Sequence, residues 1–318
     1  MNTIATGVIG AGVLGSFHIN KCKINPQINL CGFFDSNPKR LAAVAEQTGI
    51  LAYECIENLL ADVQAVILAT PASTHLEMGR ICLNAGKHLL IEKPLAASQS
   101  EGQELVELAA INKTVLHVGH SEAHNAVFSK LMTYKPQPRF IEVHRLASYS
   151  PRGTDVSVIL DLMVHDIQLI LRLCGEEPIY NAIAATGVPV ISDDIDIANV
   201  RLSFPSGCVA NLTASRISVK RMRKLRLFEK DNYFSVDLNK GEIEHYGLIR
   251  EPVTPATMPI SFVSETITPI DALETEQQAF IDAITGARPN AGVNGVEALA
   301  ILRVTDAILS RIAARPAM

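Results

Sequence analysis

Short apolar runs rich in β-branched residues alternate with helical patterns over the first third of the chain. The apolar runs cover residues 4–9, 28–34, 65–69, 88–91 and 115–118, and a weaker run covers residues 51–53. This alternation is typical of right-handed βαβ units that feed one parallel sheet. The pattern therefore predicts an N-terminal Rossmann domain, with a doubly wound parallel sheet of six strands, in residues 1–120.

Helix-start chemistry lies between these runs and again near the C-terminus. A capping residue precedes a first-turn proline in one case and a glutamate three residues further on in three others. The four starts are Asn37 with Pro38, Ser98 with Glu101, Asp271 with Glu274, and Asn294 with Glu297. The last two predict a pair of helices that closes the chain near residue 314.

After Gly119 the rhythm changes. A longer helical pattern over residues 158–173 ends at Gly175, and four or five strands follow without helices between them, among them 195–204, 208–217, 224–229 and 233–238. Apolar and polar residues alternate over 208–215, which indicates one packed and one wetter face. Residues 121–318 are therefore predicted to form an α+β domain with a large open, mostly antiparallel sheet.

Composition narrows the class of protein. The 318 residues are 48% hydrophobic and 19% charged, with a formal net charge of −5, which is typical of a folded soluble protein. The acidic balance argues against nucleic acid as the main partner. Six cysteines without a C-x-x-C pair indicate buried thiols in a reducing compartment and no metal site. No signal peptide or long apolar stretch is evident, so we expect a cytoplasmic protein without a membrane partner.

A glycine-rich turn follows the first predicted strand and opens a predicted helix. It reads Gly10-Ala11-Gly12-Val13-Leu14-Gly15. The first glycine permits the tight turn, the second lets the backbone approach a pyrophosphate, and the third allows close helix packing. The helix N-terminus also offers unpaired N–H groups to an anion. The turn therefore predicts a dinucleotide site.

Asp35 lies 20 residues after Gly15, at the end of the second predicted strand. A carboxylate there can accept hydrogen bonds from a free adenosine ribose, whereas it would repel a 2′-phosphate. We therefore expect NAD as the preferred cofactor. NADP stays open because Lys39 and Arg40 are near enough in sequence to weaken that repulsion.

Two further strand ends carry candidate chemistry. Glu92-Lys93-Pro94 follows the strand at 88–91, where open parallel sheets place their ligands. The lysine can polarise a hydroxyl or carbonyl, and the X–Pro bond can reverse the chain in its cis form. Thr70, Pro71 and His75 follow the strand at 65–69 and can line the nicotinamide side of the site. The alternative for Lys93 is an ordinary solvated charge.

Asp161 and His165 are four residues apart on the long predicted helix, so their side chains share a face. An imidazole there can take a hydroxyl proton near neutral pH, with the carboxylate to orient it. Asp166 points about 100° away around the helix. A purely structural hydrogen bond between Asp161 and His165 is the alternative.

Together these residues resemble the glucose-fructose oxidoreductase / inositol dehydrogenase / rhizopine catabolism (Gfo/Idh/MocA) family over essentially the whole chain. The resemblance rests on the glycine turn, Asp35, Glu92-Lys93-Pro94, and the run Leu160-Asp161-Leu162-Met163-Val164-His165-Asp166. It implies oxidation of a secondary alcohol of a sugar, cyclitol or nucleotide sugar with NAD or NADP. It also implies Lys93, Asp161 and His165 as the catalytic set.

The chemistry requires a base near the reacting hydroxyl. A hydride leaves the carbinol carbon for nicotinamide C4 while the hydroxyl proton leaves too, so the base must lie within about 3 Å of that oxygen. We favour His165 as the base, with Lys93 stabilising the developing alkoxide and Asp161 positioning one of them. Lys93 is the competing candidate for the base.

The substrate is indicated less directly. Residues 119–125 read GHSEAHN where many relatives carry a Gly-x-Asn-x-Arg-Phe-like run, and Gln168 stands where an aspartate is common. His120, Arg145 and Arg152 are candidate substrate contacts. The runs 144–146 and 151–155 resemble the family branch linked to UDP-N-acetylglucosamine 3-dehydrogenation. Five basic residues within 220–226 either contact a phosphate or form a solvated strand edge.

Two other functions stay open from the sequence. One is a regulatory or sensor protein that binds NAD(P) on the same fold without turnover. The other is a reductase of a biliverdin-like tetrapyrrole. In each case the open sheet has a face that neighbouring chains can cover, so we expect a homodimer or homotetramer.

Overall fold

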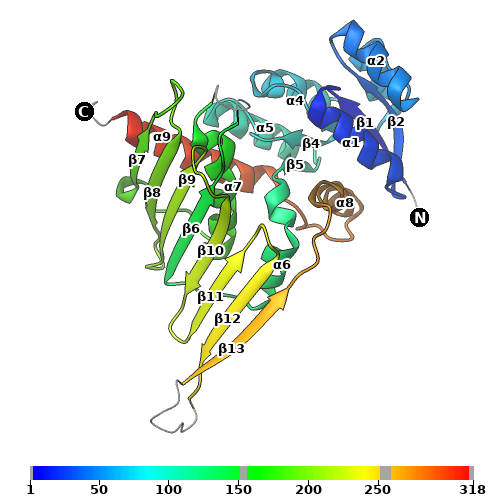
Figure 1. Ribbon diagram of the computed structural model, residues 1–318. Helices are drawn as coiled ribbons and strands as arrows, with labels where there is room; N and C mark the ends of the chain where they lie inside the picture. Colours follow the sequence, from blue (N-terminus) through cyan, green and yellow to red (C-terminus); the bar gives the residue numbers. More distant parts are fainter. Residues whose placement is uncertain (1–2, 151–155, 251–258, 315–318) are drawn as a thin grey trace. The chain divides into compact units, whose positions relative to one another are not determined.

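The computed structural model describes residues 3–150, 156–250 and 259–314. The chain forms two compact units, which Figure 1 colours from blue to red along the sequence. Unit 1 comprises Met1–His124 with Asp271–Leu302, and unit 2 comprises Asn125–Ile270 with Arg303–Met318. Unit 1 thus includes a C-terminal segment that the sequence pattern placed beyond the boundary near residue 120.

Unit 1 contains a five-stranded parallel sheet in the order β2-β1-β3-β4-β5. The strands are β1 (Ile4–Ile9), β2 (Ile28–Phe34), β3 (Ala65–Leu68), β4 (His88–Glu92) and β5 (Leu116–Gly119). This confirms the predicted Rossmann sheet. The sixth predicted strand, at 51–53, is wrong. That segment makes a single isolated bridge, Phe33 to Ala52, because helix α3 begins a few residues later and leaves no room for a ladder.

The helices of unit 1 begin largely where the capping residues predict. They are α1 (Val13–Ile24), α2 (Pro38–Thr48), α3 (Ile56–Asp62), α4 (His75–Asn84), α5 (Gln99–Ile111) and α8 (Ala272–Thr285), with short turns η1 (Ala72–Thr74) and η2 (Ser121–His124). Asn37, Ser98 and Asp271 each accept a backbone N–H of the first turn with a side-chain oxygen. These three predicted starts are confirmed.

Helix α8 explains why residues 271–302 belong to unit 1. Phe280 and Ile281 on α8 are each 1% exposed and lie in the same core cluster as Val8 and Ile19. Burying two large apolar side chains contributes several kcal/mol, at about 2 kcal/mol each. The core of unit 1 is therefore closed by a helix that follows β5 by some 150 residues in the sequence.

Unit 2 contains an eight-stranded sheet in the order β13-β12-β11-β10-β6-β9-β8-β7 (Figure 1). The strands are β6 (Phe140–Leu146), β7 (Ala184–Val188), β8 (Ile197–Ser203), β9 (Val209–Ser215), β10 (Met222–Phe228), β11 (Asn232–Asp237), β12 (Glu242–Leu248) and β13 (Ile260–Thr266). The β6–β9 pair is parallel and the other pairs are antiparallel. The mostly antiparallel open sheet is confirmed, although the pattern showed only four or five of its strands.

One face of this sheet is packed and the other is partly exposed. Ile141 and Val143 point to the packed face and are nearly fully buried, as are Leu212 and Leu225 beside them. A π-helical turn, η3 (Ile159–Met163), continues into α7 (Val164–Cys174), which packs on β6. Gly175 ends α7 at a φ of 68°, as the glycine stop predicted.

The remaining helices are α6 (Ala126–Thr133), the short turn η4 (Tyr180–Ala182) and α9 (Gly295–Ala313). Asn294 accepts the N–H of Glu297 at 3.0 Å, which confirms the last predicted helix start. None of the helices within the described ranges is both long enough and apolar enough to cross a membrane.

Candidate functional site

A pocket of about 550 Å³ lies at the carboxyl ends of β1, β2 and β3 in unit 1. Open parallel sheets bind their ligands at this edge. The residues lining it are Ile9, Gly10, Gly12, Val13, Leu14, Phe34, Asp35, Ser36, Arg40, Ala69, Thr70, Pro71, Thr74 and Met78. The residues predicted from the sequence to contact the cofactor are Gly10, Gly12, Val13, Leu14, Gly15, Asp35, Thr70, Pro71, His75, Glu92 and Lys93. All of these except Gly15, His75, Glu92 and Lys93 line the pocket.

The three glycines of the turn differ in the space around them. A Cβ on Gly10, whose φ is 90°, would lie 2.5 Å from the carbonyl oxygen of Ala69. A Cβ on Gly15 would lie 1.8 Å from the carbonyl oxygen of Gly10, so α1 can pack this closely on β1 only without one. A Cβ on Gly12 would meet no atom within 4 Å. Gly12 therefore faces open space beside the pocket.

Asp35 lines the same pocket and is buried. Its carboxylate accepts the N–H of Ala11 and the N–H of Asn37, both at 2.8 Å, and the Arg40 guanidinium lies 3.3 Å away. These contacts fix the carboxylate next to the glycine turn. A carboxylate offers about four acceptor positions, so it can still accept a ribose hydroxyl.

These features fit a dinucleotide. Gly12 leaves the space that a pyrophosphate needs at the N-terminus of α1, where backbone N–H groups favour an anion. Asp35 supplies a carboxylate that can accept a ribose hydroxyl, and the remaining lining is largely apolar, as an adenine site requires.

Lys93 follows β4 on the same sheet, is half-buried, and is joined to Pro94 by a cis peptide bond. His75 holds this turn through its two ring nitrogens. Its ring Nδ1 lies 2.8 Å from the Pro94 carbonyl oxygen and its Nε2 lies 3.0 Å from the Thr70 carbonyl oxygen. His75 is 1% exposed, so it links the ends of β3 and β4 rather than lining the pocket.

Asp161 and His165 lie in unit 2, on η3 and α7 respectively, and both side chains are half-buried. The pattern predicted one regular helix here, whereas η3 is a π-helical turn, a feature that often marks a functional segment. Asp166 points away from this face. Its carboxylate holds the buried Arg145 guanidinium, with Nε at 2.9 and 3.0 Å from its two oxygens.

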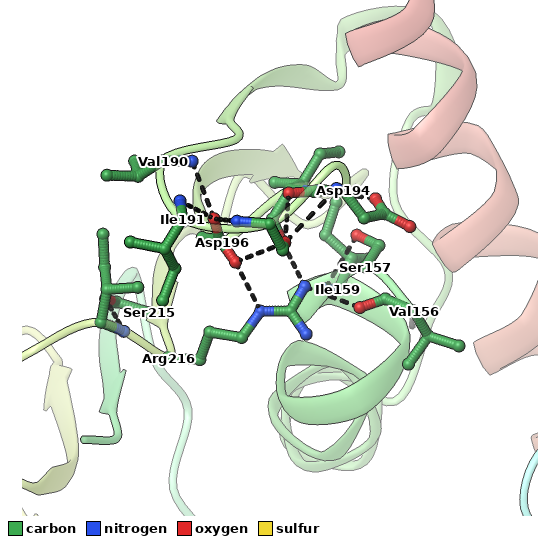
Figure 2. Close-up of polar contacts among 12 residues, drawn as sticks. Val156, Ser157, Ile159, Val190, Ile191, Asp194, Asp196, Ser215 and Arg216 are labelled. Atoms are coloured by element: carbon green, nitrogen blue, oxygen red, sulfur yellow. Dashed lines mark hydrogen bonds and ion pairs between the residues drawn. The ribbon is translucent and has the colours of Figure 1, made fainter. Parts of the chain in front are cut away.

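The chain just before η3 is anchored by a buried ion pair (Figure 2). Arg216 Nε lies 2.9 Å from Asp196 Oδ1. Arg216 Nη2 donates to the carbonyl oxygens of Val156, at 2.6 Å, and Ile195, at 2.8 Å. Arg216 thereby holds the residues that lead into the turn bearing Asp161.

Asp196 is fully buried, yet its carboxyl group stays ionised. Burial would raise the pKa of Asp196, but the backbone N–H groups of Ile191, Val190 and Ser192 and the Ser192 hydroxyl donate to it and hold the pKa well below its usual range. The charge of Asp196 is therefore available to pair with Arg216 at neutral pH.

The other predicted substrate contacts are His120, Arg145 and Arg152, and those that the structure describes are almost fully buried. His120 and Arg145 are each 2% exposed, and Arg152 lies outside the described residues. The basic run 220–226 does not form one patch, because residues alternate across β10. Lys224 and Arg226 share the open face of the sheet, where Arg226 pairs with Glu142 at 2.9 Å, whereas Arg223 lies opposite Arg145 on the packed face.

Sequence reasoning missed several residues that support the site. His18, Glu276 and Gln277 lie buried near Glu92, and Asp196 pairs with Arg216. These partners are 20 to 260 residues apart in the chain, so no local spacing could have indicated them. The one signal that the sequence offers is the presence of polar residues among apolar positions on predicted helical faces.

The fold and the pocket define a nicotinamide-dependent oxidoreductase. Residues 4–120 match the family model "Oxidoreductase family, NAD-binding Rossmann fold", and residues 133–244 match the "GFO/IDH/MocA C-terminal domain". The chain belongs to the Gfo/Idh/MocA oxidoreductase family, and its relatives include named dehydrogenases. The resemblance noted in the sequence is confirmed, and NAD is the cofactor that the family's Rossmann domain binds.

Three comparisons give the extent of the similarity. The chain is 38% identical to the UDP-N-acetylglucosamine 3-dehydrogenase of Acidithiobacillus ferrooxidans, covering 89% of this chain and 90% of that protein. A solved structure of that enzyme superposes with a TM-score of 0.90 at 34% identity, over 98% of each chain. The myo-inositol 2-dehydrogenase of Thermotoga maritima is 27% identical, covering 67% of this chain and 69% of that one.

Proposed function

We propose that this dehydrogenase transfers a hydride between a secondary alcohol of a nucleotide sugar and NAD, and that the 3-hydroxyl of UDP-N-acetylglucosamine is the alcohol oxidised. The observation that carries the proposal is the full-length similarity to the Acidithiobacillus ferrooxidans enzyme of that name. The dinucleotide pocket with a lysine at a neighbouring strand end supports it, because the reaction needs both a hydride acceptor and a group that polarises the alcohol.

Lys93, Asp161 and His165 are the proposed catalytic set. Bound NAD supplies the carbon that accepts the hydride. His165 takes the hydroxyl proton, Lys93 stabilises the negative charge that develops on the oxygen, and Asp161 orients one of these two groups. Lys93 belongs to unit 1 and the other two residues to unit 2, and the half-buried state of all three leaves part of each side chain accessible.

NAD rather than NADP is the proposed cofactor in use. The Asp35 carboxylate in the pocket supports NAD, since its negative charge would repel the 2′-phosphate of NADP. Arg40, which lines the pocket and pairs with Asp35, is the residue that would moderate this preference.

NADH formation tests the function directly. Wild-type protein is assayed with NAD and a panel of UDP-N-acetylglucosamine, other UDP-sugars, free sugars and cyclitols. Lys93→Met should lower kcat by about 10³-fold at unchanged NAD affinity, because it removes one charged group from the transition state. Lys87→Met is the matched control, since Lys87 donates to the Val63 carbonyl beyond the other end of β4. An unaffected Lys93→Met variant would contradict the role of Lys93.

His120, Arg145 and Arg152 are the remaining proposed substrate contacts. The near-complete burial of His120 and Arg145, and the pairing of Arg145 with Asp166, favour support of the site over direct contact. An Arg145→Lys variant separates the two roles. If Arg145 contacts the substrate, the variant should only raise KM for the nucleotide sugar. If Arg145 supports the site through Asp166, the variant should also lower the stability of the protein.

A homo-oligomer that buries the open face of the unit 2 sheet is also proposed. A row of aromatic rings crosses this face, with neighbouring centroids 4.8 to 5.4 Å apart. Its members are Phe140, Phe228, Tyr233, Tyr246 and Phe262, and Phe262 is 56% exposed. A contiguous exposed apolar row favours a protein partner. Sedimentation should give a dimer or tetramer, and Phe262→Lys should weaken it.

We also propose that residues 1–120 bind the cofactor and that residues 121–318 bind the substrate and form the assembly, with residues 271–302 packed in unit 1 as a structural part of the cofactor domain. A cytoplasmic location is supported by the thiols. Six cysteines without a C-x-x-C pair are typical of thiols that a reducing compartment keeps free.

A further inference from the structure

A buried polar cluster lies behind the Lys93 turn in unit 1, outside the pocket. His18 on α1, Glu92 on β4 and Glu276 on α8 each place a ligand atom within 4.8 Å of the others. His18 is fully buried and Glu276 is 3% exposed. Such groups are costly to bury unless they are paired, so their arrangement requires a physical explanation.

Gln277 determines which nitrogen of His18 carries the proton. The Gln277 Nε2 lies 3.2 Å from the His18 carbonyl oxygen, which can only accept, so the amide nitrogen must face His18. The same nitrogen lies 3.0 Å from His18 Nδ1, which must therefore accept. In the neutral ring the proton then sits on Nε2, which donates to Glu92 Oε1 at 2.8 Å.

Glu92 in turn fixes the backbone of Lys93. Its second oxygen, Oε2, accepts the backbone N–H of Lys93 at 3.2 Å. A Cβ on Gly119 would lie 3.0 Å from the same oxygen, so glycine at 119 leaves the room that the carboxylate occupies. With a donor on each oxygen, Glu92 is well placed to carry the negative charge of the cluster.

Glu276 is the group that does not carry a charge. Within the described residues, neither of its oxygens has a hydrogen-bond partner. Burial raises the pKa of Glu276 well above its usual range, and the nearby charge of Glu92 raises it further. The elements packed on α8 include α1, η2 and β5, which bring His18, Cys22, Glu122, His124 and His117 to this helix. Burial raises the pKa of the Cys22 thiol to about 12.

A metal ion is the other chemistry that one histidine and two carboxyl groups can serve. It would bind the lone pair of His18 Nε2, and Nδ1 would then have to carry the proton. The Gln277 amide nitrogen faces Nδ1, so two donors would meet there. The orientation of Gln277 therefore favours a hydrogen-bonded cluster over a metal site.

We propose that His18, Gln277 and Glu276 are positioning residues for Lys93. Together they hold the Glu92 carboxylate in place, and Glu92 alone of the two adjacent carboxyl groups, Glu92 and Glu276, carries a negative charge. A second charge on Glu276 would repel Glu92 and release the Lys93 N–H. The inference rests on the proposed function only in assigning a catalytic use to the position of Lys93.

The first experiment removes the donor to Glu92. In His18→Phe, the full-length chain should exchange the Lys93 amide hydrogen at least about tenfold faster by NMR, because Glu92 is no longer fixed. Its kcat should fall about 10²-fold while the NAD dissociation constant changes less than about twofold, as for a misplaced catalytic group. His88→Phe is the control, since His88 accepts from the Val115 N–H at the opposite end of β4.

Wild-type exchange at Lys93 in His18→Phe would overturn the proposal, and so would an unchanged kcat. If the wild-type protein oxidises none of the sugars, the proposed function fails, and the exchange rate alone then supports or overturns the positioning of Lys93.

The second experiment tests the proton on Glu276 and also serves if His18→Phe does not fold. Glu276→Gln has the shape of the neutral acid but cannot ionise. The folded-state pKa is raised, so wild type should lose stability relative to this variant as the pH rises above about 4.3, by up to tenfold in the unfolding constant per pH unit. Glu274→Gln, exposed two residues away, should follow wild type. Parallel curves for wild type and Glu276→Gln would overturn the proposal.

Discussion

The glycine turn of unit 1 and the start of the helical segment in unit 2 are held in place by different means. The turn is fixed by close backbone packing, because a Cβ on Gly10 would lie 2.5 Å from the Ala69 carbonyl oxygen and a Cβ on Gly15 would lie 1.8 Å from the Gly10 carbonyl oxygen. The segment before η3 is fixed by a buried arginine that reaches it from 60 residues away. Changes in the turn should therefore act locally on the cofactor, whereas changes at Arg216 should act on the stability of unit 2 and on Asp161 together.

The largest expected effect is at Arg216. Arg216→Met should lower the free energy of unfolding by about 3–5 kcal/mol, because Asp196 stays buried without its cation. It should also lower kcat more than NAD affinity, because η3 loses its anchor. Urea unfolding and steady-state kinetics measure these effects.

Arg201→Met is the matched control for Arg216→Met. Arg201 lies on the open face of the same sheet and donates to Asn211. Its loss should cost less than about 0.5 kcal/mol. Equal stability of the two variants would show that the Asp196–Arg216 pair does not hold the helix start.

Two glycine substitutions separate packing from binding in the turn. Gly15→Ala should destabilise the protein by about 1–3 kcal/mol, since the added methyl group overlaps the Gly10 carbonyl oxygen. Gly12→Ala should leave stability within about 0.5 kcal/mol and weaken NAD binding, because its methyl group occupies only the space that the pyrophosphate needs. Thermal unfolding and calorimetric titration with NAD distinguish them. The reverse pattern would contradict the assigned roles.

The Asp196 site adds a pH dependence that the glycine turn lacks. The pKa of Asp196 is lowered on folding, so its contribution to stability is present above the unfolded value of about 3.9 and is lost as the pH falls toward the folded value. Asp196→Asn should therefore be less stable than wild type at neutral pH, with a difference that shrinks in acid. Urea unfolding from neutral to acid pH tests this, with Asp193→Asn, exposed in the same loop, as the control.

The smallest expected effect is at Arg40. Its guanidinium is half exposed, so Arg40→Ala should change stability by less than about 1 kcal/mol. The ratio of NADP use to NAD use should fall about threefold in the variant, because the substitution removes a cation beside Asp35. Competition between the two cofactors measures the ratio. A preference that moves toward NADP would show that Arg40 does not moderate the charge of Asp35.

The sequence predicted the elements whose cause is local. The glycine turn, Asp35 and the caps at Asn37, Ser98 and Asp271 depend on residues within a few positions, and the structure has them as expected. The strand ends that form the pocket also follow from the βαβ rhythm, because parallel strands end at the same edge.

What the sequence could not predict depends on contacts between distant segments. Helix α8 joins unit 1 because Phe280 and Ile281 fill its core, which no periodicity reveals. Strand β13 is largely exposed, so it lacks the alternation that marked β9. The pairing of Arg145 with Asp166 could not be predicted either, because the two residues are 21 positions apart on different elements.

The most direct test of the central claim is NADH formation from NAD and UDP-N-acetylglucosamine by the wild-type and Lys93→Met proteins, with NAD binding measured on both. Wild type should form NADH in step with a 3-oxo sugar product, and Lys93→Met should form it about 10³-fold more slowly with equal NAD binding. Equal rates for the two proteins would contradict the central claim.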